Sequence, residues 1–210
     1  MWTTVRLCYH IDINRTRVRI TALNKEFHVS ATATTTIPAG TYAGDPIHST
    51  FGFQVRHNGV QLFRGSFDDV AVTAVSDGET VSIEGSAKVE SLNVRLADLK
   101  GHLLADEFFA ADKHPEVAFR SSAVRVDGET VEVEGELTIK GITNHVVAKG
   151  TLSGPVVGLG GQPVLGLALE TAIDRTQYGL NWQAELPSGG QALANEVKIV
   201  VEAELVKAEG

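Results

Sequence analysis

The chain has few of the features that mark secreted, disulfide-bonded or membrane-spanning proteins. Among its 210 residues Cys8 is the only cysteine, so no disulfide can form within the chain. No apolar run approaches the ~20 residues that a membrane-spanning helix needs. The first twelve residues have no continuous apolar core of the kind found in secretory signals. We therefore expect a cytoplasmic protein.

Motifs of catalytic and metal sites are also missing. There is no Gly-x-Ser-x-Gly turn that would expose a nucleophilic serine. There is no Cys-x-x-Cys or His-x-His pair with metal-ligand spacing. The glycine-rich residues 158–161 are not followed by the Lys-Ser/Thr pair of a phosphate-binding loop. We expect no catalytic residue, no metal and no catalytic cofactor.

Positive charge is scarce and unevenly placed. The chain has 18 Lys/Arg and 26 Asp/Glu, a formal net charge of −8, which argues against nucleic acid as a partner. Residues 1–36 hold five Lys/Arg and two Asp/Glu, a net charge of +3, which leaves −11 for the remainder. Residues 5–13 alternate as a strand does, and residues 30–36 are nearly all Ala and Thr. We predict a β appendage or linker over residues 1–36 and one domain over 37–210.

Alternation of apolar and polar residues dominates the chain from residue 38 onward. Phe51, Phe53 and Val55 point to one side of an extended strand, and Gln54 and Arg56 point to the other. Patterning of period two, repeated many times, predicts antiparallel sheet with one apolar face. A sheet with so many strands tends to curl and close, because closure removes its edges. The chain is therefore predicted to be an all-β barrel.

Turn residues divide this pattern into hairpins and one helical interruption. Asp-Gly turns at 76–79 and 127–129 are predicted to join strand 70–75 to 81–87 and strand 117–126 to 131–139. The further strands are predicted at 146–152, 165–173 and 197–206, with residues 154–161 as a flexible loop. Over residues 98–113 apolar side chains recur at helical spacing, so one covered helix is expected there, ending before Pro115.

Short motifs follow one another along residues 40–206. They are GTY at 40–42, DPIHS at 45–49, FQVRH at 53–57, RGSF at 64–67, GHLLADEFF at 101–109, HP at 114–115, GELTIKGIT at 135–143, DRTQYGLNW at 174–182 and NEV at 195–197. In this order they resemble the YceI-like family, a lipocalin-like group of β-barrels that bind polyisoprenoids. Residues 1–36 have no counterpart in that pattern.

The resemblance implies an eight-stranded antiparallel up-and-down lipocalin-like barrel around a long apolar tunnel, often as a homodimer. It implies storage or transport of a long-chain isoprenoid lipid, either a prenyl diphosphate or an isoprenoid quinone, without catalysis. The inward apolar positions expected to line the tunnel are Phe51, Phe53, Val55, Leu62, Phe67, Leu103, Leu104, Phe108, Phe119, Leu137, Leu167, Leu169 and Trp182.

Polar residues near the tunnel are candidates for contact with the lipid head group. They are His48, Arg56, His57, His102, Arg175, Tyr178 and Asn181. Arg56 and Arg175 suit a diphosphate because the guanidinium fork matches phosphate oxygens. A quinone needs only hydrogen-bond donors such as Tyr178 and Asn181. Asp174 is expected to cap a short helical turn by accepting from backbone N–H groups.

Two other functions fit the same residues. The apolar stripes also suit a barrel filled by its own side chains, which would be a structural or interaction protein that binds a partner through its outer face or residues 1–36. An enzyme acting on prenyl lipids is the other alternative, with His48, Arg56 and His57 as its acid–base and anion site. A void inside the barrel would distinguish the binding protein from the filled barrel.

Overall fold

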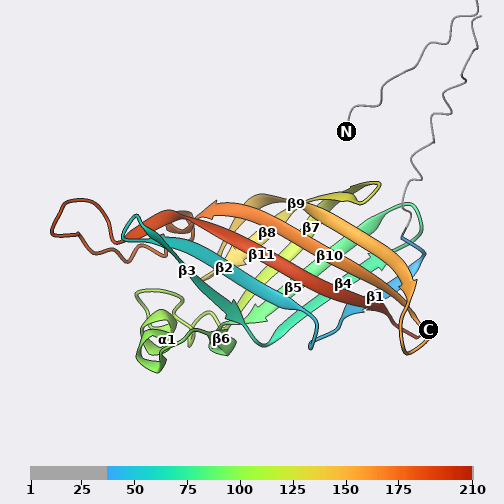
Figure 1. The fold of residues 1–210 in the computed structure, drawn as a ribbon, viewed down its shortest axis with the longest axis horizontal. Helices are drawn as coiled ribbons and strands as arrows, with labels where there is room; N and C mark the ends of the chain where they lie inside the picture. Colours follow the sequence, from blue (N-terminus) through green and yellow to red (C-terminus); the bar gives the residue numbers. More distant parts are fainter. Residues whose placement is uncertain (1–36, 210) are drawn as a thin grey trace, which may run out of the picture. The chain divides into compact units, whose positions relative to one another are not determined.

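The computed structural model describes residues 37–209, so the predicted N-terminal appendage and Cys8 lie outside it (Figure 1). The described strands are β1 (Gly40–Gly44), β2 (Thr50–His57), β3 (Gln61–Phe67), β4 (Val70–Ser76), β5 (Val81–Lys88), β6 (Leu92–Asn93), β7 (Glu116–Asp127), β8 (Thr130–Ile139), β9 (Ile142–Val157), β10 (Pro163–Asp174) and β11 (Leu193–Lys207). The described helical elements are α1 (Ala97–Leu104) and the 3₁₀ turns η1 (Val89–Ser91) and η2 (Arg175–Tyr178). No helix in this part of the chain has the length and apolar character needed to cross a bilayer.

Eight of the strands form a closed ring, in the order β1-β4-β5-β7-β8-β9-β10-β11. The ring closes because β1 pairs with β4 on one side and with β11 on the other, both antiparallel. The sheet pairing along the ring is antiparallel throughout. The predicted eight-stranded antiparallel barrel is confirmed.

Three further strands extend the sheet at one end of the barrel. β1 pairs with the last residues of β11, and β2 pairs with the earlier part of β11, so β1 and β2 follow one another along the same neighbour. β3 pairs with β2 along its whole length but reaches β6 only at Ser66 and Phe67. Residues 61–65 of β3 therefore form an edge of the sheet, beside the insert 89–115 that carries β6 and α1 (Figure 1).

The hairpins lie where the turn residues predict them. Val70 of β4 pairs with Ala87 of β5, and Val126 of β7 pairs with Val131 of β8. The predicted loop 154–161 is partly wrong, because β9 continues as a strand to Val157. Pairing with β10 on one side provides ladder hydrogen bonds for these residues despite their glycine content.

The predicted helix is too long. α1 ends at Leu104 because Ala105 is extended, and the chain then turns repeatedly up to residue 113. Ala110 adopts a left-handed conformation with φ of 49°, which a continuous helix cannot contain. Phe108 and Ala110 are still buried. Their helical spacing therefore indicates burial of this segment and not a regular helix.

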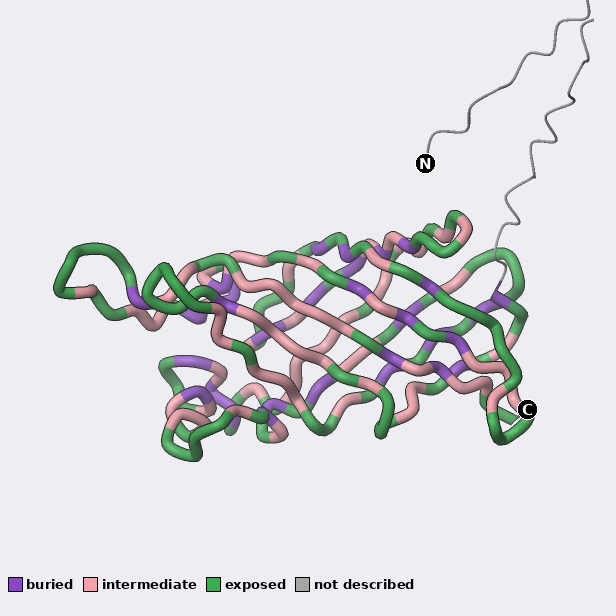
Figure 2. Tube along the Cα trace, viewed as in Figure 1, coloured by how far each residue is buried: buried purple, intermediate pink, exposed green. Residues whose placement is uncertain are grey.

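Burial alternates along the strands as the sequence pattern requires (Figure 2). In β8, Val131, Val133 and Leu137 are buried, whereas Glu136, the residue before Leu137, is exposed. The buried residues form two clusters, one that includes Tyr42 and Leu165 and one that includes Leu103 and Tyr178. The second cluster joins the insert to the barrel.

Close approach of β9 and β10 gives a prediction for stability. A Cβ atom on Gly150 would collide with the carbonyl oxygen of Ala168 and lie 3.0 Å from the Cα of Leu169, and neither backbone atom can move freely. Gly150→Ala should lower the free energy of unfolding by about 1–3 kcal/mol. Gly166→Ala is the control, because its Cβ would meet only the Cβ of Ser153 at 3.7 Å. Equal midpoints for the two variants in urea denaturation would contradict the prediction.

Candidate functional site

A cavity of about 770 Å³ lies inside the barrel and is lined almost entirely by apolar side chains. Its wall combines strands on opposite sides of the barrel with the helical insert; for example Phe53 of β2, Leu169 of β10 and Leu103 of α1 all contribute. The volume falls within the range of about 300–1,000 Å³ that is usual for ligand pockets. The interior is therefore not filled by the side chains of the barrel, which contradicts the filled-barrel alternative.

The structure places most of the predicted tunnel residues in this wall. They are Phe51, Phe53, Val55, Leu62, Phe67, Leu103, Phe108, Phe119, Leu137, Leu167, Leu169 and Trp182. Leu104 does not line the cavity; it lies at the end of α1 and packs against the cluster that includes Leu103. Leu104 follows Leu103 in α1, and neighbouring residues of a helix point about 100° apart, so the two side chains do not share one face.

Several wall residues were not singled out from the sequence. Among them are Phe63, Val72, Leu99, Val117, Ile139, Val146, Val197, Ile199 and Val201. Strand register would have identified some of them, since Phe63 pairs with Val55 and Ile199 pairs with Phe53 on the same face. The register between two strands cannot be predicted from the sequence of either strand alone.

An aromatic cluster joins the insert to the loop that follows η2. The ring of His102 meets Phe108 and Trp182 edge-on, with centroids 5.1 and 5.5 Å away, and the Phe108 and Trp182 centroids are 5.4 Å apart. His102 Nε2 also lies 3.1 Å from a carboxylate oxygen of Glu107. His102 also lines the cavity, as part of this packed cluster. His57 lines it too, as an exposed residue at the end of β2.

Arg175 has a structural role that its sequence position does not reveal. It is only 3% exposed. Its Nε donates to the carbonyl oxygen of Ala194 at 2.9 Å, and its Nη1 donates to those of Leu180 and, at 2.9 Å, Trp182. Burial lowers the pKa of the guanidinium. Arg175 borders the cavity, but its donors hold the loop after η2, which argues against the contact with a diphosphate that was predicted for it.

The cap predicted at Asp174 is confirmed. Its Oδ1 accepts from the backbone N–H of Thr176 at 2.9 Å and from the Thr176 hydroxyl at 2.6 Å. These hydrogen bonds, that of the hydroxyl first, lower the pKa of the Asp174 carboxyl. The cap fixes the start of η2 and with it the direction in which Arg175 enters the protein.

Three other candidates for head-group contact lie away from the cavity wall. Arg56 follows the inward Val55 in β2, so it projects to the outer face and is exposed. Tyr178 is only 1% exposed and packs in the cluster that includes Leu103, where burial raises its pKa. Asn181 is exposed and does not line the cavity. The structure does not bring these residues to the site for which they were predicted.

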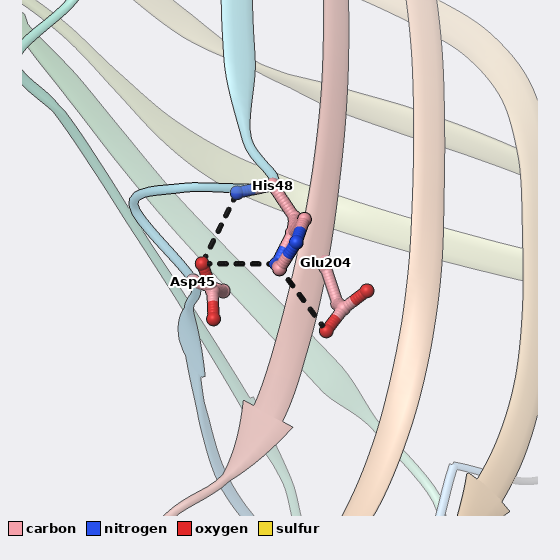
Figure 3. Close-up of side chains that lie close together, drawn as sticks. All are labelled: Asp45, His48 and Glu204. Carbon is pink, nitrogen blue, oxygen red and sulfur yellow. Dashed lines mark hydrogen bonds and ion pairs between the residues drawn. The ribbon is translucent and has the colours of Figure 1, made fainter. Parts of the chain in front are cut away.

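His48 lies in a surface cluster with Asp45 and Glu204 (Figure 3). Its Nδ1 is 3.3 Å from Asp45 Oδ1 and 3.9 Å from Glu204 Oε1. Asp45 also accepts the backbone N–H groups of Ile47 and His48, which lower the pKa of its carboxyl. None of the three lines the cavity. The cluster fixes the turn between β1 and β2, so His48 too is not brought to the predicted head-group site.

Comparisons with known proteins agree with this architecture. Residues 42–205 match the profile of the YceI-like domain. The UPF0312 protein of Staphylococcus aureus (strain bovine RF122 / ET3-1) is 33% identical over 167 residues, which cover 76% of this chain and 94% of that relative. The counterpart in strain N315 gives the same identity and coverage.

Two solved structures share the fold. Burkholderia cenocepacia BcnA superposes with a TM-score of 0.64 at 19% identity, covering 79% of this chain and 99% of BcnA. A polyisoprenoid binding domain from Saccharophagus degradans superposes with a TM-score of 0.60 at 15% identity, covering 80% of this chain and 98% of that domain.

Proposed function

The chain belongs to the YceI-like family, and from this and its cavity we propose that it binds a long-chain isoprenoid lipid for storage or transport without catalysing a reaction. The observation that supports this most strongly is the cavity of about 770 Å³ with an apolar wall inside a closed barrel. A prenyl diphosphate and an isoprenoid quinone each have a long apolar tail, which suits a cavity with an apolar wall. The structure from Saccharophagus degradans, named as a polyisoprenoid binding domain, supports the same ligand class.

Three polar side chains of the wall support binding without catalysis. The guanidinium of Arg175 donates to backbone carbonyl groups, and His102 lies beside Glu107 within an aromatic cluster. Glu170 forms an ion pair with Lys198 at 2.6 Å. Each of these groups has a structural partner within the protein, so none is poised as an acid or base toward the cavity.

The energetics of a long apolar tail favour this kind of site. Each CH₂ group removed from water contributes about 0.8 kcal/mol, so a five-carbon unit contributes about 4 kcal/mol before the cost of ordering it. Affinity would come mainly from the tail. The length of tail that the cavity can enclose would set which lipid binds most tightly.

This function predicts a strong dependence of affinity on tail length. For a series of linear prenols, we expect each added five-carbon unit to lower the Kd at least about tenfold until the cavity is full. The measurement is equilibrium binding to delipidated protein, together with mass spectrometry of solvent extracts from the purified protein. A protein that carries no lipid after purification and binds short and long prenols alike would refute the proposed function.

A further inference from the structure

Two arginines that the sequence did not single out line both the cavity and a smaller cleft next to it. Arg64 is in β3, and Arg95 follows β6 just before α1. β6 pairs antiparallel with β3, with Asn93 opposite Ser66. The next residue, Val94, keeps this alignment, since its Cγ1 lies 3.2 Å from the position of a Cβ on Gly65. The strand pairing ends before this point, and Arg95 lies at a bend one residue further on, where it lines the cavity together with Arg64.

Neither guanidinium has a carboxylate within ion-pair distance in residues 37–209. Nη1 of Arg64 donates to the carbonyl oxygen of Leu62 at 3.4 Å. Several exposed cations elsewhere on the barrel are paired, as in Arg120–Glu84, Arg125–Glu132, Lys149–Glu132 and Lys198–Glu170, although Arg56 of β2 has no carboxylate partner within residues 37–209. In a segment with a net charge of −11, this unpaired cationic pair is well suited to an anion from outside the chain.

The two arginines stand where the cavity meets the surface. Both line the cavity, and both line a smaller cleft of about 370 Å³ that shares Gly52 and Phe53 with it. Both are exposed. The register with β2 sets Arg64 opposite Gln54, on the outer face, whereas the neighbouring Phe63 pairs with the inward Val55. An amphiphile with its tail in the cavity can thus present its head to this rim.

We propose that Arg64 and Arg95 together bind the anionic head group of the lipid, a diphosphate or monophosphate at the end of a prenyl chain. This assignment rests on the proposed function of the cavity. Guanidinium forks bind phosphate oxygens through paired, charge-assisted hydrogen bonds. A quinone head would leave both cations without a partner. The ligand class is therefore narrowed to prenyl phosphates, held by a pair of residues different from Arg56 and Arg175.

The test compares a prenyl diphosphate with the uncharged prenol of the same chain length on the full chain. We expect the wild type to bind the diphosphate at least about tenfold more tightly than the prenol, with the preference falling at high salt. R64Q, R95Q and the double variant should lose this preference, because their affinity for the diphosphate falls to about that for the prenol. R120Q is the control, since it removes the same charge from an exposed arginine outside the cavity wall and should keep the preference.

The outcomes separate this assignment from the proposed function. Equal affinity of the wild type for diphosphate and prenol, with tail-length dependence intact, overturns the head-group assignment and leaves the lipid-binding function standing. Loss of tail-length dependence overturns both. Inorganic diphosphate is the third ligand: binding as tight as that of the prenyl diphosphate would show a free-anion site and overturn the lipid assignment. The two single variants are read separately, so a fold defect in one does not prevent the test.

Discussion

Leu169→Asp should abolish lipid uptake by a barrel that still folds. Leu169 is 7% exposed and lies in the cavity wall, between Gly150 of β9 and Val201 of β11. In the empty cavity, water can solvate the new carboxylate. An apolar tail would displace that water and offer no hydrogen bond, which costs several kcal/mol. We expect the Kd for a prenol to rise at least about a hundredfold.

The matched control lies three residues along the same strand. Ala172 is exposed on the outer face of β10, opposite Lys198 of β11, so Ala172→Asp adds the same charge without touching the cavity. It should bind prenols as the wild type does. Binding isotherms and thermal unfolding of both variants are the measurements. Where Leu169→Asp does not fold, Phe53→Asp at a half-buried position of the wall replaces it. If Leu169→Asp or Phe53→Asp folds and still takes up lipid, the lipid does not bind in this cavity.

The barrel itself was predictable because the sequence patterns that specify its strands and turns each lie within a short stretch of the chain. Period-two alternation fixes which face of a strand is apolar, and Asp-Gly turns fix where strands end, as in the hairpin of β7 and β8. The end of α1 was not predictable in this way. Leu104 and Phe108 have helical spacing, but the turns after Ala105 bury Phe108 without helical geometry. Spacing reports which residues are buried more reliably than the conformation that buries them.

The apolar wall of the site follows from the same alternation, whereas the polar groups do not. Whether an arginine or a histidine is free depends on partners that are distant in the sequence. His48 meets Glu204 from the last strand. Arg64 and Arg95 line the same cavity because β6 pairs with the end of β3. Such contacts are set by the closed sheet and the path of the insert, which no single stretch of sequence encodes.

Arg175→Met should destabilise the protein strongly, although arginine and methionine have similar volumes. The guanidinium donates to the carbonyl oxygens of Leu180, Trp182 and Ala194, and its Nη2 lies 3.4 Å from acceptors on Leu193 and Asn195. Each buried carbonyl left without a donor costs about 1–3 kcal/mol. We expect the free energy of unfolding to fall by about 3–5 kcal/mol. Arg175→Lys should rescue little of this, because a lysine lacks the planar fork that reaches several acceptors at once.

Urea denaturation of Arg175→Met beside Arg120→Met tests this expectation. Arg120 is 75% exposed and paired with Glu84, and the loss of an exposed pair should cost less than about 1 kcal/mol. Because Arg175 holds the backbone at Trp182, a wall residue, the variant should also bind prenols more weakly. A stability change as small as that of the control would mean that the carbonyl groups do not depend on the guanidinium. Arg175 would then be free to bind a diphosphate. The main reason for assigning the head group to Arg64 and Arg95 instead of Arg175 would be lost.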